Sequence, residues 1–361
     1  MLNRLKQLFA KEEARDTSTD TLFNAYSTIA ATSKLDFPHT LNGRRDLSDA
    51  ELPKHLNGFM HYLADKGEGT MSRTRYHVIR HLQRVQQHYV LSVAHSDLPA
   101  FHAWAQDVNA ILFMEDGRVL DPQGRLLLPP QGDKGADPQA AVPYPPQAWQ
   151  RKARTDELLA ARKIVVPADL PPLVSEPELR QRSPEDILRR MLALFVVAIR
   201  AESLTSETPI VVADLQKRFP PAFTDLTEAE RAFLAKDAPT EQEITQFLWR
   251  YECILVLQWA LGLQDALPFA DAICDVASIS STVIDRGTDG LRKQPTARAG
   301  GEMLDALDLH YRLHWASRQA LLKKTPVPAD LNDSVLQERH HALNWLIRFE
   351  DRDWDDVDTP T

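Results

Sequence analysis

The spacing of apolar residues changes along the chain, from short alternating stretches to long helical ones. Residues 88–93 alternate polar and apolar side chains and include two valines, which predicts a strand. Residues 110–114 are a short apolar run and predict a second strand. Residues 72–87 and 97–109 carry apolar side chains at intervals of three and four, which predicts two helices.

The rest of the N-terminal region is less regular. Residues 22–32 suit either a strand or a short helix, and the sequence leaves both open. Ser48 and Glu51 have the spacing of a capping box, in which two side chains bond the first free N–H groups of a helix. Together with the predicted strands, these patterns indicate a small α+β domain over residues 1–128.

Residues 129–178 differ from both neighbouring regions because they contain ten prolines. Proline lacks the backbone N–H and clashes inside helices, so a high density of proline favours an extended, stiff chain. The sequence therefore predicts a linker over this stretch.

The chain after Ser183 has the signals of helices. Ser183 followed by Pro184 is a strong helix start, and Thr227 and Thr240 each begin a capping box. The second box precedes an apolar helix predicted over residues 244–261, which Gly262 is placed to end. Further helices are predicted over residues 184–199, 304–322 and 333–349. We expect an all-α domain over residues 179–361, which makes the protein predominantly α overall.

Several charged residues fall where these helices should be apolar, at about 100° per residue. They are Glu252, Asp305, Asp308, Arg312, Glu338 and Arg339. A buried charge needs a partner, so the first interpretation is an ion-pair network that fixes how the helices pack. Two alternatives use the same residues: a pocket that binds a small charged ligand, or a site of acid–base chemistry. The same rotation of about 100° per residue places His341 and Asn344 on the solvated side of the helix predicted over residues 333–349.

A second charged set lies on the helix over residues 72–87. Arg73, His77, Arg80 and Arg84 lie within about 60° of one another, opposite the apolar side. This set is either a solvated basic face or a site for an anion or an acidic partner. His77 and His81 have the spacing of two metal ligands, but no third ligand accompanies them, so no metal is expected.

Composition narrows the possible functions. The first 128 residues carry equal numbers of acidic and basic side chains, so the whole net charge of −9 falls on the remainder. That acidity argues against a nucleic-acid partner and favours a basic protein partner. No apolar run approaches the roughly 20 residues of a membrane span. Two cysteines in apolar surroundings predict free thiols in a reducing compartment, the cytoplasm.

The last residues are acidic but include a tryptophan. Glu350, Asp351, Asp353, Asp355, Asp356 and Asp358 surround Trp354. An acidic run is typical of a solvated end, whereas a tryptophan favours burial. The alternative is a tail held against the domain, with its acids near Arg182, Arg189 or Arg190.

Four separated motifs resemble a bacterial domain-of-unknown-function family, number 4272. They are Trp249-Arg-Tyr-Glu252, Asp308-Leu-His-Tyr-Arg312 with Trp315-Ala316, Glu338-Arg-His-His-Ala-Leu-Asn-Trp345, and Asp353-Trp-Asp-Asp356 with Thr359-Pro-Thr361. The resemblance covers roughly residues 180–361. It implies a helical domain and a cytoplasmic location, and because the family has no assigned activity, cofactor or catalytic residue, no site is carried over from it.

No P-loop, dinucleotide fingerprint, Ser-His-Asp order or zinc motif accompanies the charged cluster. The first functional hypothesis is therefore a non-enzymatic interaction or accessory protein without a cofactor. The second is a binder of a small charged ligand, and the third is a hydrolase at the same cluster. The sequence leaves the oligomeric state open.

Overall fold

The structure is a computed structural model that describes residues 20–31, 33–66, 71–293 and 296–361. The chain divides into two compact units, Met1–Pro145 and Pro146–Thr361. Each unit has its own hydrophobic core. Among the residues that are described, no helix is both long enough and apolar enough to cross a membrane.

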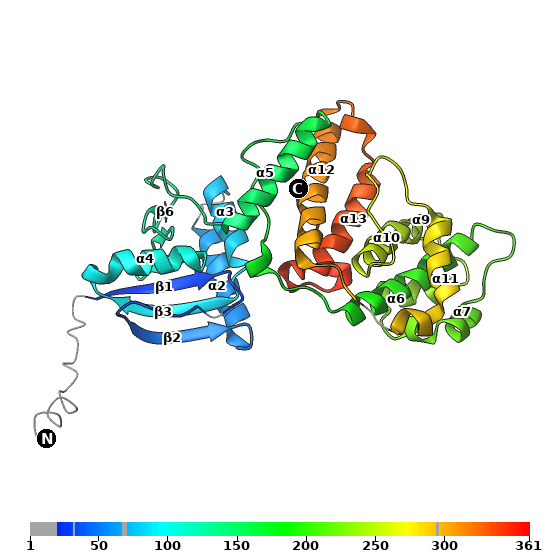
Figure 1. Cartoon of the computed structure of the whole chain (residues 1–361), viewed down its shortest axis with the longest axis horizontal. Helices are drawn as coiled ribbons and strands as arrows, with labels where there is room; N and C mark the ends of the chain where they lie inside the picture. The colour runs from blue at the N-terminus through cyan, green and yellow to red at the C-terminus, as the bar shows by residue number, and fades with distance from the viewer. Residues whose placement is uncertain (1–19, 32, 67–70, 294–295) are drawn as a thin grey trace, which may run out of the picture. The chain divides into compact units, whose positions relative to one another are not determined.

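Within its described residues, the first unit is built on a six-stranded antiparallel sheet with the order β2-β3-β1-β4-β5-β6. The strands are β1 (Thr21–Ser27), β2 (Thr40–Asp46), β3 (Gln87–Val93), β4 (Ala110–Met114), β5 (Val119–Leu120) and β6 (Leu126–Leu128). Helix α4 (Leu98–Asp107) covers one face, and α2 (Glu51–Asp65) and α3 (Arg73–Leu82) cover the other (Figure 1). Side chains alternate between the two faces: Phe23 and Ala25 pack under α4, whereas Tyr26 packs under α2.

Most of this unit follows the sequence pattern. The strands predicted over residues 88–93 and 110–114 are confirmed, and the open stretch after residue 21 is the strand β1. The capping box at Ser48 is wrong, because its hydroxyl donates to Asp46 Oδ1 at 2.6 Å and α2 begins at Glu51. Strand β2 was not predicted. It lies at the edge of the sheet and contains Gly43 at a break in register. Its extended conformation depends on pairing with β3, which the local sequence pattern does not reveal.

The second unit is mostly helical. Its helices are α5 (Pro146–Ala161), α6 (Pro184–Ser203), α7 (Val212–Arg218), α8 (Glu228–Leu234), α9 (Glu241–Leu248), α10 (Arg250–Ala260), α11 (Val276–Arg292), α12 (Gly300–Lys323) and α13 (Asp333–Leu346). Helix α6 is buried on nearly every side and packs against α10, which in turn packs against α13. Helix α12 lies beside both α13 and α5 (Figure 1).

The predicted helix starts are confirmed. The Ser183 hydroxyl accepts from the N–H of Asp186 at 3.1 Å, and the boxes at Thr227 and Thr240 are both closed by a glutamate. The helix predicted over residues 244–261 is divided in two at Trp249, where the chain makes an i→i+3 turn to Glu252. Gly262 follows α10 with a φ of 68°, a left-handed conformation that suits glycine and ends the helix.

The prediction of a linker over residues 129–178 is wrong in part, because α5 lies inside this stretch. Pro146 occupies the first helical position, where its missing N–H costs nothing, and no proline interrupts the helix after it. Leu159 is buried in a cluster with Leu313 and Ala316 of α12. The proline-rich composition therefore conceals a helix that belongs to the second unit.

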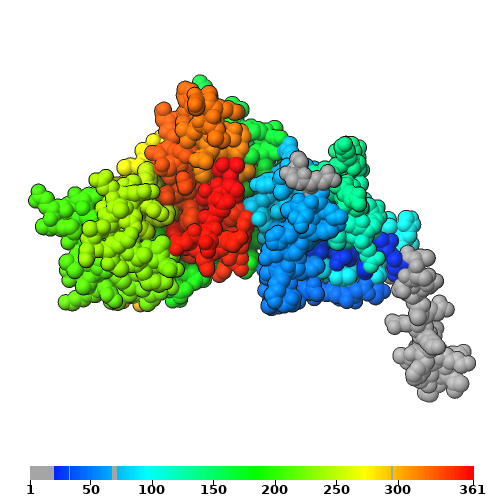
Figure 2. Space-filling model, turned by 180° about the vertical axis from the view of Figure 1, so that it is seen from behind, coloured from blue at the N-terminus to red at the C-terminus, as the bar shows by residue number. Residues whose placement is uncertain are grey.

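The acidic tail is held against the helical unit (Figure 2). Trp354 is 4% exposed, packs edge-on against Trp345, and has the Arg190 guanidinium 5.2 Å above its ring. Asn344 is buried beneath the tail and donates to the carbonyl of Asp358 at 2.9 Å, so its expected place on the solvated side is wrong.

Of the arginines that the sequence suggested, Arg182 interacts electrostatically with Asp351 and Asp353, whereas the ion pairs of Asp351 in the described residues are with other arginines. Asp351 lies 3.6 Å from Arg180 and 3.6 Å from Arg348. Arg182 donates instead to the carbonyl of Arg352 at 2.9 Å. The tail is therefore held by the buried Trp354, by hydrogen bonds to its backbone carbonyls and by ion pairs of Asp351.

We expect the substitution Trp354→Ala to lower the free energy of unfolding of the helical unit by about 3–5 kcal/mol, because it leaves a large cavity. The control is Asp355→Ala at the exposed neighbouring position, which should stay within about 0.5 kcal/mol of the parent. Urea unfolding followed by circular dichroism measures both. Equal effects of the two variants would mean that the tail does not stabilise the domain.

Candidate functional site

Two of the six predicted charged residues form an ion pair that joins two helices and a loop. Glu252 of α10 and Arg339 of α13 are 2.8 Å apart, and their side chains are 2% and 0% exposed. The other Glu252 oxygen accepts from the N–H of Cys274 at 2.6 Å. Arg339 also donates to the carbonyl of Pro268 at 2.5 Å. The pair therefore ties the segment after α10 to the core of the unit.

A second pair lies within α12. Arg312 donates to both carboxylate oxygens of Asp308, at 2.9 and 3.0 Å, in a bidentate arrangement. Its guanidinium also donates to the carbonyl of Pro171 at 3.1 Å and lies 3.7 Å from Asp156 of α5. This pair therefore links α12 to α5 and to the chain that follows α5.

The remaining two predicted acids lie apart from these pairs. Glu338 pairs with Arg250 at 2.6 Å and accepts from the Cys253 thiol at 3.1 Å. Asp305 was expected between two apolar sides of α12, but its side chain is 53% exposed. It binds Arg151 at 2.7 Å and Arg154 at 2.9 Å, because α5 lies next to this side of α12. The six residues thus form separate ion pairs rather than the wall of one pocket.

The basic face of α3 does not converge on a single point. Arg73 is exposed, whereas His77, Arg80 and Arg84 are half-buried. Arg84 lies 4.5 Å from the centre of the Tyr144 ring, and Arg80 donates to Gln83 at 2.7 Å. Arg80 and Arg84 thus contact side chains of their own unit, and both interpretations of this face, solvated surface and anion site, stay predictions.

His81 is fully buried, whereas His77 is half-buried. Its Nε2 lies 3.0 Å from the Tyr26 carbonyl, and burial lowers its pKa to about 3. In the described part of the chain, no group of three His, Cys, Asp or Glu residues is placed to hold a metal ion.

Sequence reasoning missed a group of buried histidines between α12 and α13. His314 and His340 face each other with 3.1 Å between their Nδ1 atoms, and His310 lies one turn earlier on α12. Burial lowers the pKa of His310 and of His314 to about 4 and lowers that of His340 further. The four-residue spacing of His310 and His314 was the available signal.

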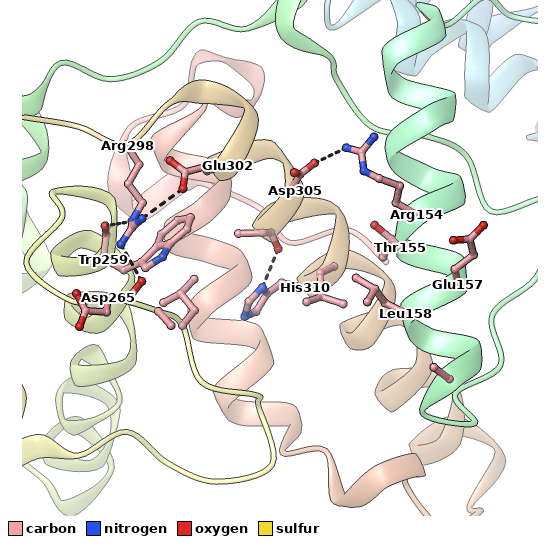
Figure 3. A pocket seen from close by; sticks show the side chains of 15 residues that line it. Arg154, Thr155, Glu157, Leu158, Trp259, Asp265, Arg298, Glu302, Asp305 and His310 are labelled. Atoms are coloured by element: carbon pink, nitrogen blue, oxygen red, sulfur yellow. Dashed lines mark hydrogen bonds and ion pairs between the residues drawn. The ribbon is translucent and has the colours of Figure 1, made fainter.

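An open groove of about 730 Å³ lies on the helical unit beside these pairs (Figure 3). Its floor is one face of α12, formed by Glu302, Ala306 and Leu309, which are spaced three and four positions apart. One wall is α5, and the other is Trp259 with residues 265–267. The wall residues of α5 are Arg154, Thr155, Glu157, Leu158 and Ala161.

Two arginines fix the wall formed by the loop. Arg298 donates to the carbonyls of Trp259, Gln264 and Asp265 at 2.8, 2.8 and 2.9 Å. Its guanidinium lies 5.1 Å from the Trp259 ring centre. Farther along the loop, Arg339 holds the carbonyl of Pro268. The buried Glu252–Arg339 pair therefore supports one wall of the groove, and of the six predicted charged residues only Asp305 lines it.

The groove is acidic where it meets solvent. Arg154 is paired with Asp305, and Arg298 lies 3.3 Å from Glu302. Glu157 on the α5 wall and Asp265 on the loop wall are both exposed, and neither has an ion pair within the described ranges. Each wall thus offers one carboxylate to a ligand.

Comparison with known proteins found one family. The model of the family described as "Domain of unknown function (DUF4272)" matches residues 151–357, which is more than half of the chain. The matched region begins inside α5, so it contains the whole lining of the groove. Neither the search of curated proteins nor the search of solved structures found a match.

We expect Arg339→Met to lower the free energy of unfolding by about 3–5 kcal/mol, because Glu252 is then buried without its partner. Replacing both residues, in a Glu252→Leu/Arg339→Met variant, should restore part of this loss. The control is Lys236→Met, which breaks a half-exposed pair with Glu243 and should cost at most about 1 kcal/mol. Urea denaturation compares the three, and equal losses at the two sites would contradict the buried-pair interpretation.

The buried histidines predict a loss of stability in acid. Their pKa values are about 4 for His310 and for His314 in the folded protein, below the ordinary 6.5. The unfolded chain therefore binds protons first as the pH falls. Stability is complete above pH 6.5 and declines toward pH 4, by up to about 1.4 kcal/mol per pH unit for each histidine.

Urea denaturation of the parent and of a His314→Gln/His340→Gln variant between pH 7 and pH 4.5 measures this slope. The variant should show a shallower decline, because two of the groups that take up protons on unfolding are gone. An identical slope would mean that other groups cause the acid sensitivity.

Proposed function

We propose that this chain, which belongs to the DUF4272 family, is a non-enzymatic interaction protein whose groove between α5, α12 and the 265–267 loop binds a basic amphipathic segment of a partner protein. The observation that carries the proposal is the groove itself, which has a leucine on its floor and on each wall and an exposed carboxylate on each wall.

The shape of the groove favours a protein segment over a small molecule. Pockets for small molecules enclose most of the surface of their ligand, whereas this groove is open to solvent. Its lining follows the three- and four-residue spacing of α5 and α12, so it offers parallel rows of side chains. A guest helix recognises such rows with apolar anchors of the same spacing.

The apolar lining supplies the anchor points. Leu158 is 58% exposed on the α5 wall, and Leu267 and Leu309 line the groove opposite it and below it. An exposed leucine beside other apolar side chains gains from being covered, by about 25 cal/mol per Å² of apolar area removed from water.

The charge of the groove favours a basic partner. Glu157 and Asp265 would pair with lysine or arginine residues at the edges of the bound segment. The net charge of −9, carried by the chain after residue 128, would also speed the approach of a basic partner at low salt.

The placement of the charged residues supports binding rather than catalysis. The acids that were candidates for acid–base chemistry, Glu252, Asp308 and Glu338, are engaged by arginines that hold helices together. The hydrolase and charged-ligand hypotheses therefore gain no support from this cluster. Cys253 and Cys274 are buried free thiols, which agrees with the cytoplasmic location that we expect.

The binding test uses a fluorescent amphipathic helix of leucine and lysine as its probe, with a leucine–glutamate helix of equal apolar content for comparison. We expect the lysine peptide to bind the full chain and the glutamate peptide not to bind. Leu158→Asp should weaken binding about tenfold, because it places a charge against the apolar face of the guest.

Leu322→Asp is the matched control. It adds the same charge at an exposed leucine of the neighbouring helix α12, outside the groove, and should leave the affinity unchanged. Fluorescence anisotropy measures both variants. Equal binding by the parent and by Leu158→Asp would place the peptide elsewhere and contradict the proposed function.

A further inference from the structure

One side chain of the groove has a polar atom that the fold leaves unused. His310 is 4% exposed, yet its imidazole lines the groove beside the loop wall (Figure 3). On the α12 helix it lies about 140° from Asp305, which faces α5. His310 and Asp305 thus mark opposite sides of the floor.

Contacts inside the fold determine which nitrogen of His310 carries the proton. Its Nδ1 lies 2.7 Å from the carbonyl oxygen of Ala306. A carbonyl only accepts, so Nδ1 must donate, and the neutral ring then has its lone pair on Nε2. Burial lowers the pKa of His310 to about 4, so the ring is neutral at physiological pH.

No donor from the described part of the chain reaches Nε2. Arg339 of α13, whose positive charge acts on His310, is turned to Glu252 and to the carbonyl of Pro268. On α12 itself, His314 faces His340. Across the groove, Arg298 is turned to three carbonyls and to Glu302.

We propose that His310 is the specificity-determining anchor of the groove, where its Nε2 accepts a hydrogen bond from the cationic N–H of a lysine or arginine side chain of the bound segment. This inference rests on the proposed function and deepens it. The groove then selects a segment with one basic residue directed inward among its apolar anchors, in addition to the basic residues at its edges.

The groove would select a cation because a bound segment that covers the Nε2 acceptor without supplying a donor loses binding free energy. An apolar side chain over Nε2 would remove the water that hydrates it and would leave the lone pair unpaired. Such a loss reduces affinity about tenfold, and a cationic donor avoids it. Glu302 and Asp265, which also line the groove, add to its attraction for a cation.

Two substitutions test the roles of the two ring nitrogens of His310 separately. His310→Asn keeps an N–H that can reach Ala306 and removes the acceptor on the floor. His310→Gln keeps an acceptor where Nε2 lies. With the leucine–lysine helix as the probe, we expect about tenfold weaker binding for His310→Asn and at most about threefold for His310→Gln.

The second measurement identifies the partner group. Each lysine of the probe is replaced in turn by norleucine, which keeps the apolar stem and removes the ammonium. One replacement should weaken binding to the parent about tenfold and should have no further effect on His310→Asn. Thermal melting of each variant shows that its fold is kept.

The outcomes distinguish this inference from the proposed function. If Leu158→Asp weakens binding but both His310 variants bind like the parent, the groove binds the segment and the anchor is wrong. If both His310 variants lose binding equally, or if no lysine couples to His310, the role of His310 is structural and the anchor is again wrong. If Leu158→Asp has no effect, the proposed function itself fails.

Discussion

Glu252 and Arg339 are paired at 2.8 Å in a place that water does not reach, and the arrangement of the helical unit depends on this pair. Neither charge would be tolerated there alone, because removing an ion from water costs several kcal/mol. Each is therefore surrounded by further partners, the N–H of Cys274 for Glu252 and the carbonyl of Pro268 for Arg339. The requirement to satisfy both charges fixes α10, α13 and the intervening loop relative to one another.

The same requirement explains how a groove persists on the surface of the unit. A loop between α10 and α11 would ordinarily be among the more mobile parts of a fold. Here Arg298 holds the first part of the loop, Arg339 holds its middle at Pro268, and Glu252 holds its end at Cys274, so the loop is a fixed wall. The floor is α12, whose position against α5 is set by Arg151 and Arg312. A binding surface prepared in this way loses little entropy when a ligand binds.

Buried charge thus has a structural role in this protein and a functional consequence. An ion pair adds little net stability compared with apolar side chains of the same volume, but it favours one arrangement of helices over others. Burying Glu252 and Arg339 costs desolvation free energy, and a fixed position of the groove wall, which binding requires, explains why the pair is there. His310 differs from these paired charges, because it lines the groove and its Nε2 has no hydrogen-bond partner in the described residues.

The sequence alone determined what depends on neighbouring residues. The caps at Ser183, Thr227 and Thr240, the strands around residues 88–93 and 110–114, and the burial of Glu252 and Arg339 all follow from spacing within a few turns. The resemblance to the DUF4272 family in the C-terminal part is likewise confirmed, and the matched region extends back to residue 151.

Only the tertiary structure decided what depends on distant segments. Asp305 is half exposed and pairs with arginines of α5, the helix that lies beside it. The proline-rich composition around α5 had concealed that helix. Asn344 is buried because the tail folds over it. Three segments far apart in the chain, α5, the loop after α10 and α12, meet to form the groove. Periodicity places a side chain on a face of its own helix, but what covers that face is set by packing between segments, which no local pattern encodes.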